Sequence, residues 1–203
     1  PDLHSYPTRR SSDLGLIVSF EPVIDMFHQL SSVAQNDAKW RTYQFALGST
    51  DEVRSINVMR SDQFSSFLSP VRDAIPAYSN LNLVDHTETV KVNRLADVVA
   101  ALRSEFGFER AFLKLDTQGY DLEVIAGAGP NLADFVALQS EMSVQPIYQG
   151  MPNYRRAIDV LESMGFVISN LFAVSVENQR LVEFDCVMIR DRKSTRLNSS
   201  HGI

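Results

Sequence analysis

Apolar residues follow two different spacings along the chain, and each spacing predicts one kind of element. Short apolar or alternating runs are typical of strands, and nearly continuous runs suit strands that are covered on both faces. Apolar residues that recur every three or four positions are typical of amphipathic helices. The runs predict strands at residues 15–20, 40–47, 56–59, 87–92, 111–115, 135–144, 166–174 and 181–189. The second spacing predicts helices at residues 23–33, 95–106 and 153–164, and one that carries Leu122, Val124 and Ile125.

The order of these elements indicates the fold class. Strands alternate with helices, apart from an excursion before residue 95 that carries two short strands. Such alternation implies an α/β fold with a mostly parallel sheet and helices on both faces. The last two strands are joined by residues 177–180, which predicts an antiparallel hairpin. We therefore expect a doubly wound, Rossmann-like sheet that is mostly parallel and closes with a C-terminal antiparallel hairpin.

The two ends of the chain differ in character from the rest. Residues 1–14 and residues 193–203 are polar and have no apolar period. Both segments resemble translations of sequencing-adapter oligonucleotides, and natural disordered tails are the alternative. We therefore expect one domain, at residues 15–192, between two tails that take no part in the fold.

Composition excludes several classes of protein. The chain carries a net charge of -6, whereas a protein that binds a nucleic-acid backbone needs a basic face. No apolar run approaches the roughly 18 residues of a membrane-spanning helix. The single cysteine, Cys186, has no second cysteine with which to form an internal disulfide. We therefore expect a cytoplasmic globular protein with no nucleic-acid partner and no membrane span.

Two acidic residues stand at the carboxyl ends of predicted strands. Glu21 follows the strand at residues 15–20, and Asp116 follows the strand at residues 111–115. Ligands of open α/β sheets bind outside these strand ends, and an acid there accepts hydrogen bonds from a ribose diol. A solvated strand-end acid is the alternative for Glu21. For Asp116 the alternative is an N-cap of the following helix, and this stretch alone leaves the two interpretations level.

Five stretches of the sequence resemble the FkbM family of S-adenosylmethionine-dependent methyltransferases. They are residues 18–22 (VSFEP), 45–48 (FALG), 112–121 (FLKLDTQGYD), 139–143 (QSEMS) with 148–151 (YQGM), and 183–187 (EFDCV). The resemblance implies the methyltransferase version of the doubly wound fold, with strand order 3-2-1-4-5-7-6. It also implies methyl transfer to a small-molecule or glycan acceptor, namely a hydroxyl of a sugar, a glycolipid or a secondary metabolite.

The same resemblance implies a set of residues that bind the cofactor, S-adenosylmethionine. Glu21 matches the family acid that binds the ribose hydroxyls, and Pro22 follows it. Ala46 and Leu47 match the segment that borders the adenine. Asp116 matches the aspartate that closes the fourth strand, near the methionine end of the cofactor and the acceptor.

Asp116 and Glu141 are the expected catalytic residues, because both lie near the ends of strands that are adjacent in the proposed order. Either would orient or deprotonate the acceptor hydroxyl, and a structural hydrogen bond is the alternative for Glu141. Gln118, Tyr120 and Tyr148 are the expected acceptor contacts. Gln118 stands where the family more often has glutamate, so the base is not expected at that position. Packed aromatic surface is the alternative for both tyrosines.

The sequence departs from the family pattern in one larger respect. No Gly-x-Gly-x-x-Gly motif occurs, and Gly127-Ala128-Gly129 follows a helix, where a C-terminal cap is the better interpretation. The first strand and glycine-rich loop of the family are expected before Gly15. We therefore expect a truncated, impaired domain that binds neither S-adenosylmethionine nor NAD tightly.

Other classes of function remain as alternatives. A nicotinamide-dependent oxidoreductase fragment would also use Glu21 for its ribose, although the closing hairpin favours the methyltransferase. A non-catalytic fragment is the second alternative. Asp116 and Glu141 would suit Mg²⁺, and Asp85-His86-Thr87-Glu88 suggests a metal site, for which a surface strand is the alternative. We expect no metal.

Overall fold

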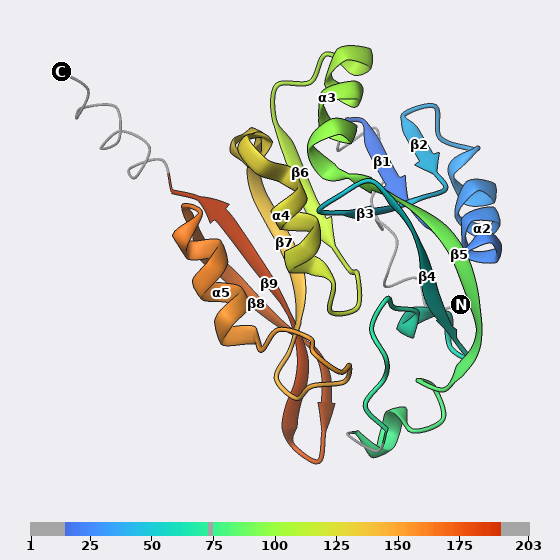
Figure 1. The fold of residues 1–203 in the computed structure, drawn as a ribbon. Helices are drawn as coiled ribbons and strands as arrows, with labels where there is room; N and C mark the ends of the chain where they lie inside the picture. Colours follow the sequence, from blue (N-terminus) through green and yellow to red (C-terminus); the bar gives the residue numbers. More distant parts are fainter. Residues whose placement is uncertain (1–14, 73–74, 192–203) are drawn as a thin grey trace.

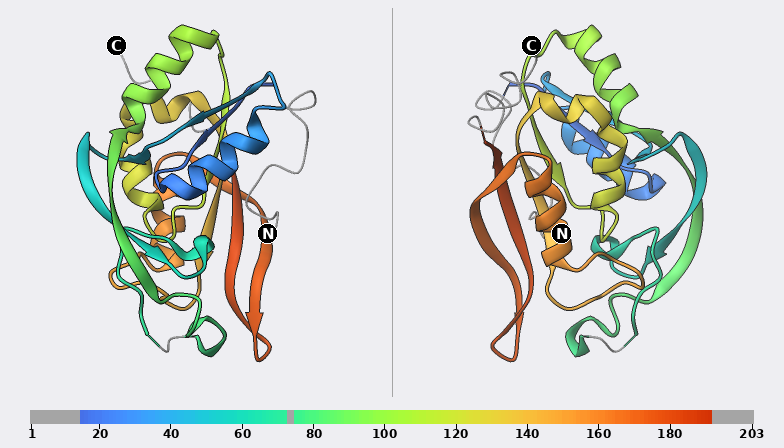
Figure 2. Two further views of the ribbon diagram at one scale, coloured as in Figure 1. Left: turned by 90° about the vertical axis from the view of Figure 1, so that its right-hand side faces the viewer. Right: turned by 60° about the vertical axis from the view of Figure 1, so that its left-hand side comes forward.

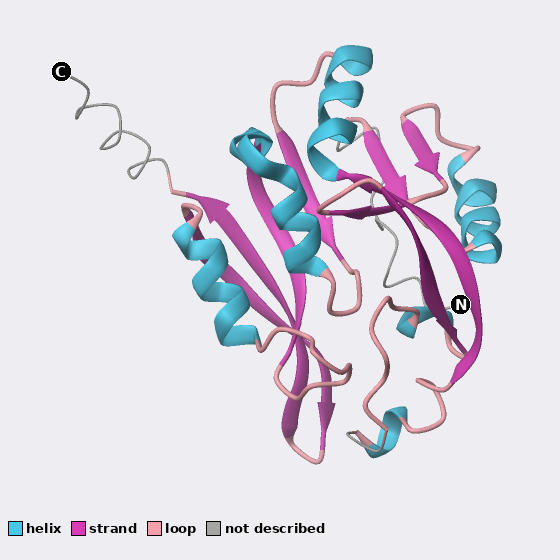
Figure 3. Cartoon of the chain, in the orientation of Figure 1, coloured by secondary structure: helices cyan, strands magenta, loops and turns pink. Residues whose placement is uncertain are grey.

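A computed structural model describes residues 15–72 and 75–191 of the chain (Figures 1 and 3). The strands are β1 (Ile17–Phe20), β2 (Trp40–Tyr43), β3 (Ala46–Gly48), β4 (Glu52–Met59), β5 (Val84–Arg94), β6 (Ala111–Leu115), β7 (Phe135–Ser143), β8 (Phe166–Glu177) and β9 (Arg180–Arg190). The α-helices are α2 (Ile24–Ala34), α3 (Leu95–Phe106), α4 (Asp121–Ala128) and α5 (Tyr154–Ser163). Short 3-10 helices are η2 (Asp62–Phe64), η3 (Pro76–Tyr78) and η4 (Gly129–Asp134).

The described strands form three sheets. Strands β1 and β2 pair in parallel. Strand β5 pairs in parallel with β3 and antiparallel with β4. The third sheet has the order β6-β7-β9-β8, in which β6 and β7 are parallel and β9 is antiparallel to both of its neighbours.

These sheets agree with the expected fold class in part. The fold is mixed α/β, the C-terminal hairpin is antiparallel, and the order β6-β7-β9-β8 corresponds to the 4-5-7-6 half of the expected sheet. Within the described residues three of the six strand pairings are antiparallel, so the expectation of a mostly parallel sheet was wrong. The additional antiparallel pairing comes from the excursion, in which β5 runs back along β4. The doubly wound arrangement and the missing first strand stay predictions.

The expected strand at residues 40–47 is divided into β2 and β3. Residues 40–43 pair with β1, whereas residues 46–48 pair with β5 in a different sheet. The chain therefore leaves one sheet and enters another between Tyr43 and Ala46. Because apolar residues continue to alternate across this break, the sequence pattern did not reveal it.

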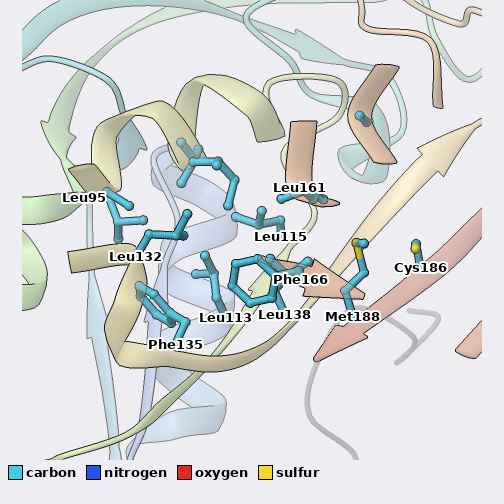
Figure 4. Close-up of a cluster of buried hydrophobic side chains, with 14 of the residues drawn as sticks. Leu95, Leu113, Leu115, Leu132, Phe135, Leu138, Leu161, Phe166, Cys186 and Met188 are labelled. Atoms are coloured by element: carbon cyan, nitrogen blue, oxygen red, sulfur yellow. The ribbon is translucent and has the colours of Figure 1, made fainter. Parts of the chain in front are cut away.

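The main core lies between one face of the sheet β6-β7-β9-β8 and the helices α4 and α5 (Figures 2 and 4). Leu113 and Leu115 of β6 lie on the same side as Leu138 of β7, because alternate residues of a strand point to the same face. They pack with Ile125 of α4 and Leu161 of α5 in one buried cluster. Each such side chain contributes about 1.5–3 kcal/mol through its burial.

Part of the opposite face of this sheet is exposed among the described residues. Phe112 of β6 is 54% exposed and Ile189 of β9 is 44% exposed, although both are large apolar side chains. The helices of the described part that pack on this sheet contribute to the core on the other face. The expectation of helices on both faces is therefore not met at this sheet.

The part of the excursion that joins β4 to β5 packs back onto the protein and forms a second core. Its side chains cluster with those of the loop after β7 and of β9: Met59, Phe64, Ile75, Ile147, Tyr148 and Val182. Two backbone hydrogen bonds join the segments, from Val71 N to Ile147 O at 2.9 Å and from Gln149 N to Ser69 O at 2.8 Å. The excursion and the loop after β7 therefore form one packed unit.

Local signals explain where two of the helices begin or end. The side chain of Asn153 accepts a hydrogen bond from Arg155 N and so caps the start of α5. Gly107 follows α3 with φ 67°, a left-handed conformation that glycine adopts without steric cost.

The two predicted tails, residues 1–14 and 193–203, lie outside the described residues. The expected domain boundaries therefore stay a prediction. No helix in the described part of the chain has the length and apolar character needed to cross a membrane.

Candidate active site

The two predicted catalytic acids lie close together at the ends of β6 and β7. Leu115, the last residue of β6, pairs in register with Ser140, so Asp116 and Glu141 each follow one member of that pair. The side-chain amide of Gln118 lies between them. Its Nε2 is 3.0 Å from Asp116 Oδ1 and 3.5 Å from Glu141 Oε2. Parallel pairing thus brings the two carboxyl groups to one site.

Gln118 is held by two residues from distant parts of the chain. The Tyr148 hydroxyl lies 2.9 Å from Gln118 Oε1, and the Ser66 hydroxyl donates to the backbone carbonyl of Gln118 at 2.8 Å. The backbone of Gln118 has φ 51°, a left-handed conformation that is uncommon outside glycine. The turn after β6 is therefore fixed by tertiary contacts.

Glu141 has an electrostatic environment that favours its protonated form. Burial, together with the neighbouring charges of Asp116 and Glu183, raises the pKa of Glu141 to about 9. At neutral pH, Glu141 therefore retains its proton and can donate a hydrogen bond. The carboxylate of Asp116 lies 3.4 Å from the Nζ of Lys114. Two adjacent carboxyl groups in different environments are a common basis for acid–base chemistry.

The alternative interpretation of Asp116 as a helix cap finds no contact to support it. Its carboxylate is bonded to Gln118 Nε2 and Lys114 Nζ, and α4 begins without a side-chain capping bond at Tyr120. The acid that organises this turn is Asp121, which accepts hydrogen bonds from the backbone N and the hydroxyl of Thr117. Asp121 is buried on the main-core side.

A second buried acid, Glu183 of β9, lies close to this site and was not predicted as a site residue. Its carboxylate accepts hydrogen bonds from Tyr78 at 2.8 Å, Ser143 at 3.2 Å and Ser175 at 3.3 Å. Burial raises the pKa of Glu183, and these three donors oppose the rise. A signal was present in the sequence, because an acid in the middle of an apolar strand needs buried partners.

The predicted cofactor residue Glu21 lies at the carboxyl end of β1. Its carboxylate accepts a hydrogen bond from Val23 N at 2.9 Å, and its own backbone N donates to Tyr43 O. Strands β1 and β6 point toward the same lower side in Figure 1, so Glu21 and Asp116 both follow strand ends on that side. This placement is the one that ligands of α/β sheets require.

The remaining predicted cofactor residues lie in the turn after β1 and in β3. Pro22 occupies the turn between β1 and α2 and is half-buried. Ala46 is buried in β3, and Leu47 packs against the main core. Strand β3 touches α4 so closely that a Cβ atom on Gly127 would lie 1.9 Å from Gly48 O. Gly127 thus lies within α4 and allows close packing, whereas the predicted C-terminal cap is Gly129, which follows the helix.

The two tyrosines predicted to contact the acceptor are buried. Tyr148 is 1% exposed, and its hydroxyl lies 2.8 Å from Phe64 O in addition to its contact with Gln118. Tyr120 is 6% exposed; its hydroxyl accepts a hydrogen bond from Arg54, and its ring packs against Phe67. The packed-aromatic alternative therefore describes where both side chains lie.

The described surface includes a small cleft beside the candidate site and a larger one elsewhere. A small one of about 20 Å³ is lined by Asp121, Ser140, Glu141 and Tyr154 among others, and such a volume suits about one water molecule. A larger one of about 410 Å³ lies between the first turn of α2 and strands β4 and β5, and it contains no predicted site residue.

His86 lines this larger cleft, and a carboxylate lies beside each of its ring nitrogens. Its Nδ1 lies 3.0 Å from Asp85, and its Nε2 lies 3.2 Å from Glu88. These hydrogen bonds raise the pKa of His86 and use both ring nitrogens as donors. Within residues 15–72 and 75–191 no set of three or more histidine, cysteine, aspartate or glutamate side chains is arranged to hold a metal ion.

Comparison with known families decides the class of the protein. The chain matches the model of the methyltransferase FkbM domain over residues 2–168. The chain belongs to this family. The FkbM match contains every predicted site residue, from Glu21 to Tyr148, and it lends no support to the nicotinamide-dependent alternative. No curated protein and no solved structure matches the chain significantly.

Proposed function

We propose that this FkbM-family chain transfers a methyl group from S-adenosylmethionine to a hydroxyl oxygen of a small-molecule or glycan acceptor. The acceptor classes that we propose are a sugar, a glycolipid or a secondary metabolite. The observation that carries the proposal is the pair of carboxyl groups of Asp116 and Glu141, which the amide of Gln118 bridges at the ends of two parallel strands.

The residues at these strand ends fit the proposed cofactor. Glu21 presents a carboxylate at the end of β1, which suits the two hydroxyls of a ribose. Pro22 follows Glu21 in the chain, Ala46 and Leu47 lie in β3, and Asp116 follows the end of β6. S-adenosylmethionine, when bound, supplies an electrophilic methyl group on a sulfonium centre.

The two acids would have different roles toward the acceptor. Asp116 is the more exposed of the two and would accept the proton of the acceptor hydroxyl. Glu141 retains its own proton at neutral pH and would donate a hydrogen bond at the same site. Gln118 would hold the two groups at a fixed separation through its amide nitrogen. The buried side chains of Tyr120 and Tyr148 would pack beneath the site and so determine its shape.

Binding and turnover test this proposal separately. Because the sequence contains no Gly-x-Gly-x-x-Gly motif, we expect calorimetry to give an affinity for S-adenosylmethionine weaker than micromolar. Micromolar binding would contradict that expectation, and binding of NAD alone would favour the oxidoreductase alternative. Methyl transfer is measured with radiolabelled cofactor and a panel of glycosides, glycolipids and hydroxylated metabolites.

The catalytic roles are tested by replacing each acid with its amide, here and at the matching positions of another family member. Asp116→Asn should lower methyl transfer by about 10²–10⁴-fold, the usual contribution of a general base. Glu141→Gln should lower it less, because an amide also donates a hydrogen bond. Asp97→Asn, an exposed acid on α3, is the matched control. Unchanged turnover in both Asp116→Asn and Glu141→Gln would overturn the assignment.

A further inference from the structure

Gln118 adopts a backbone conformation that its own chemistry does not favour. Three non-glycine residues of the described chain have positive φ: Gln118, Asn178 and Gln179. The last two form the tight turn between β8 and β9, where such angles are expected. Gln118 lies instead between β6 and α4, at the candidate site. A side chain held at positive φ beside a site requires surrounding contacts that maintain it.

Ser66 supplies the first of these contacts. It is 1% exposed, and its hydroxyl donates to Gln118 O at 2.8 Å while accepting from Leu68 N at 3.0 Å. The backbone of Ser66 is itself fixed, because it exchanges two hydrogen bonds with Asn57 of β4, at 2.9 Å and 3.1 Å. A rigid part of the excursion therefore determines the direction of the Gln118 carbonyl.

Tyr148 supplies the second contact and orients the side chain. Its buried hydroxyl lies 2.9 Å from Gln118 Oε1. On the other side of the amide, Asp116 Oδ1 lies 3.0 Å from Nε2, and a carboxylate oxygen only accepts hydrogen bonds. The amide nitrogen must therefore face Asp116, which leaves Oε1 as an acceptor beside the Tyr148 hydroxyl, whose single proton it shares with the carbonyl of Phe64 at 2.8 Å. The flipped amide would place its oxygen against the carboxylate.

We propose that Ser66 and Tyr148 are positioning residues that fix the carboxyl pair of Asp116 and Glu141 through Gln118. The contact chain joins three segments that are far apart in sequence: the excursion, the turn after β6 and the loop after β7. Tyr148 also pairs with Pro70 of the excursion, so the two positioning residues belong to one packed unit. The catalytic consequence rests on the proposed function, whereas the structural consequence does not.

The structural arm follows the side-chain amide of Gln118 by NMR in protein labelled at glutamine nitrogen, with Gln118→Glu used to assign its signals. Tyr148→Phe should shift the signals of that amide, because it removes the hydroxyl that lies 2.9 Å from Oε1. Ser66→Ala should broaden or shift the same signals. The matched control is Tyr78→Phe, which removes another tyrosine hydroxyl near the second core but leaves Gln118 untouched. Unchanged Gln118 signals in both Ser66→Ala and Tyr148→Phe would overturn the proposal.

A double-mutant cycle keeps the test decisive if a variant is unstable. Glycine adopts positive φ freely, so in the background Gln118→Gly the substitution Ser66→Ala should lower Tm by less than it does in the original chain. Equal shifts of Tm in the two backgrounds would contradict the role of Ser66 in holding this conformation.

The catalytic arm separates this proposal from the proposed function. Loss of positioning should lower kcat about tenfold in Tyr148→Phe and leave the KM for S-adenosylmethionine unchanged, because the hydroxyl acts on the acid pair. A changed KM with unchanged kcat would overturn the positioning role. If the amide signals respond as expected but the unmodified chain transfers no methyl group, the positioning stands and the proposed function fails.

Discussion

Asp121 and Glu141 are two acids on opposite sides of β7, and their surroundings differ. Asp121 faces the main core, where Ser140 and both donors of Thr117 bond to its carboxylate. Burial raises the pKa of Asp121, and these hydrogen bonds oppose the rise. Glu141 follows Ser140 in the strand and faces the other side, where it meets a distant amide and the acidic Asp116.

The difference separates a structural acid from one that is available for chemistry. Buried polar groups are stable where donors satisfy them, and Asp121 meets that condition. Glu141 lies against another carboxyl group, and the protein retains it by keeping it protonated. Successive side chains of β7 point to opposite faces, so Ser140 bonds to the structural acid Asp121 of α4, whereas Glu141 faces the candidate site.

The largest expected effect on stability comes from removing the structural acid. Asp121→Ala leaves the hydroxyl of Ser140 and the backbone N of Thr117 without their partner. The free energy of unfolding should fall by about 1–3 kcal/mol, measured by denaturant titration. Asp121→Asn, which keeps the shape and one acceptor, should lose less. If Asp121→Ala cost no more than Glu141→Gln at neutral pH, the distinction between the two acids would be lost.

A second effect should appear in the pH dependence of stability at Glu141. The pKa of Glu141 in the folded state, about 9, lies above its unfolded value of about 4.3. Its contribution to stability is therefore fully present below the unfolded pKa and is lost as the pH rises through the folded pKa. Between pH 5 and 9 the original chain should therefore lose free energy of unfolding relative to Glu141→Gln, whose amide does not titrate.

The measurement is a series of denaturant titrations across that pH range on both proteins. Glu183 and Asp121 remain in both, so the difference between the two curves isolates position 141. Parallel curves would mean that Glu141 titrates alike in the folded and unfolded states.

The smallest effect should come from Lys114, whose Nζ lies 3.4 Å from Asp116. Both side chains are about one-third exposed, at 36% and 33%, and ion pairs in such positions contribute little. Lys114→Gln should change the free energy of unfolding by less than about 0.5 kcal/mol. The difference should shrink further in high salt, which a titration at two ionic strengths would check. A loss as large as that of Asp121→Ala would show that this ion pair contributes as much to stability as the buried hydrogen bonds of Asp121.

Several elements of the fold were predictable because their signals are local. The predicted helix at residues 95–106 and strand at residues 111–115 coincide with α3 and β6. The apolar spacing marked both elements, and Gly107 marked the end of the helix. The convergence of Asp116 and Glu141 followed from a general rule, since the carboxyl ends of adjacent parallel strands meet.

The rest depended on contacts between distant segments. The division of residues 40–47 between two sheets follows from their partners, and nothing in their own pattern marks it. The burial of Tyr148 follows from the packing of the excursion, which has no regular period. The departure at Gln118 was visible in the sequence, but its bridging role required Ser66 and Tyr148 to be placed beside it.

The single thiol of the chain, Cys186, offers a direct measure of motion behind the candidate site. It pairs in register with Ser140, has no exposed surface, and burial raises its pKa to about 11. Because thiol reagents attack the thiolate, modification requires β9 to separate from its surroundings and admit solvent. The labelling rate therefore reports how often the sheet opens next to Glu141. No probe has to be introduced, and no second thiol contributes to the signal.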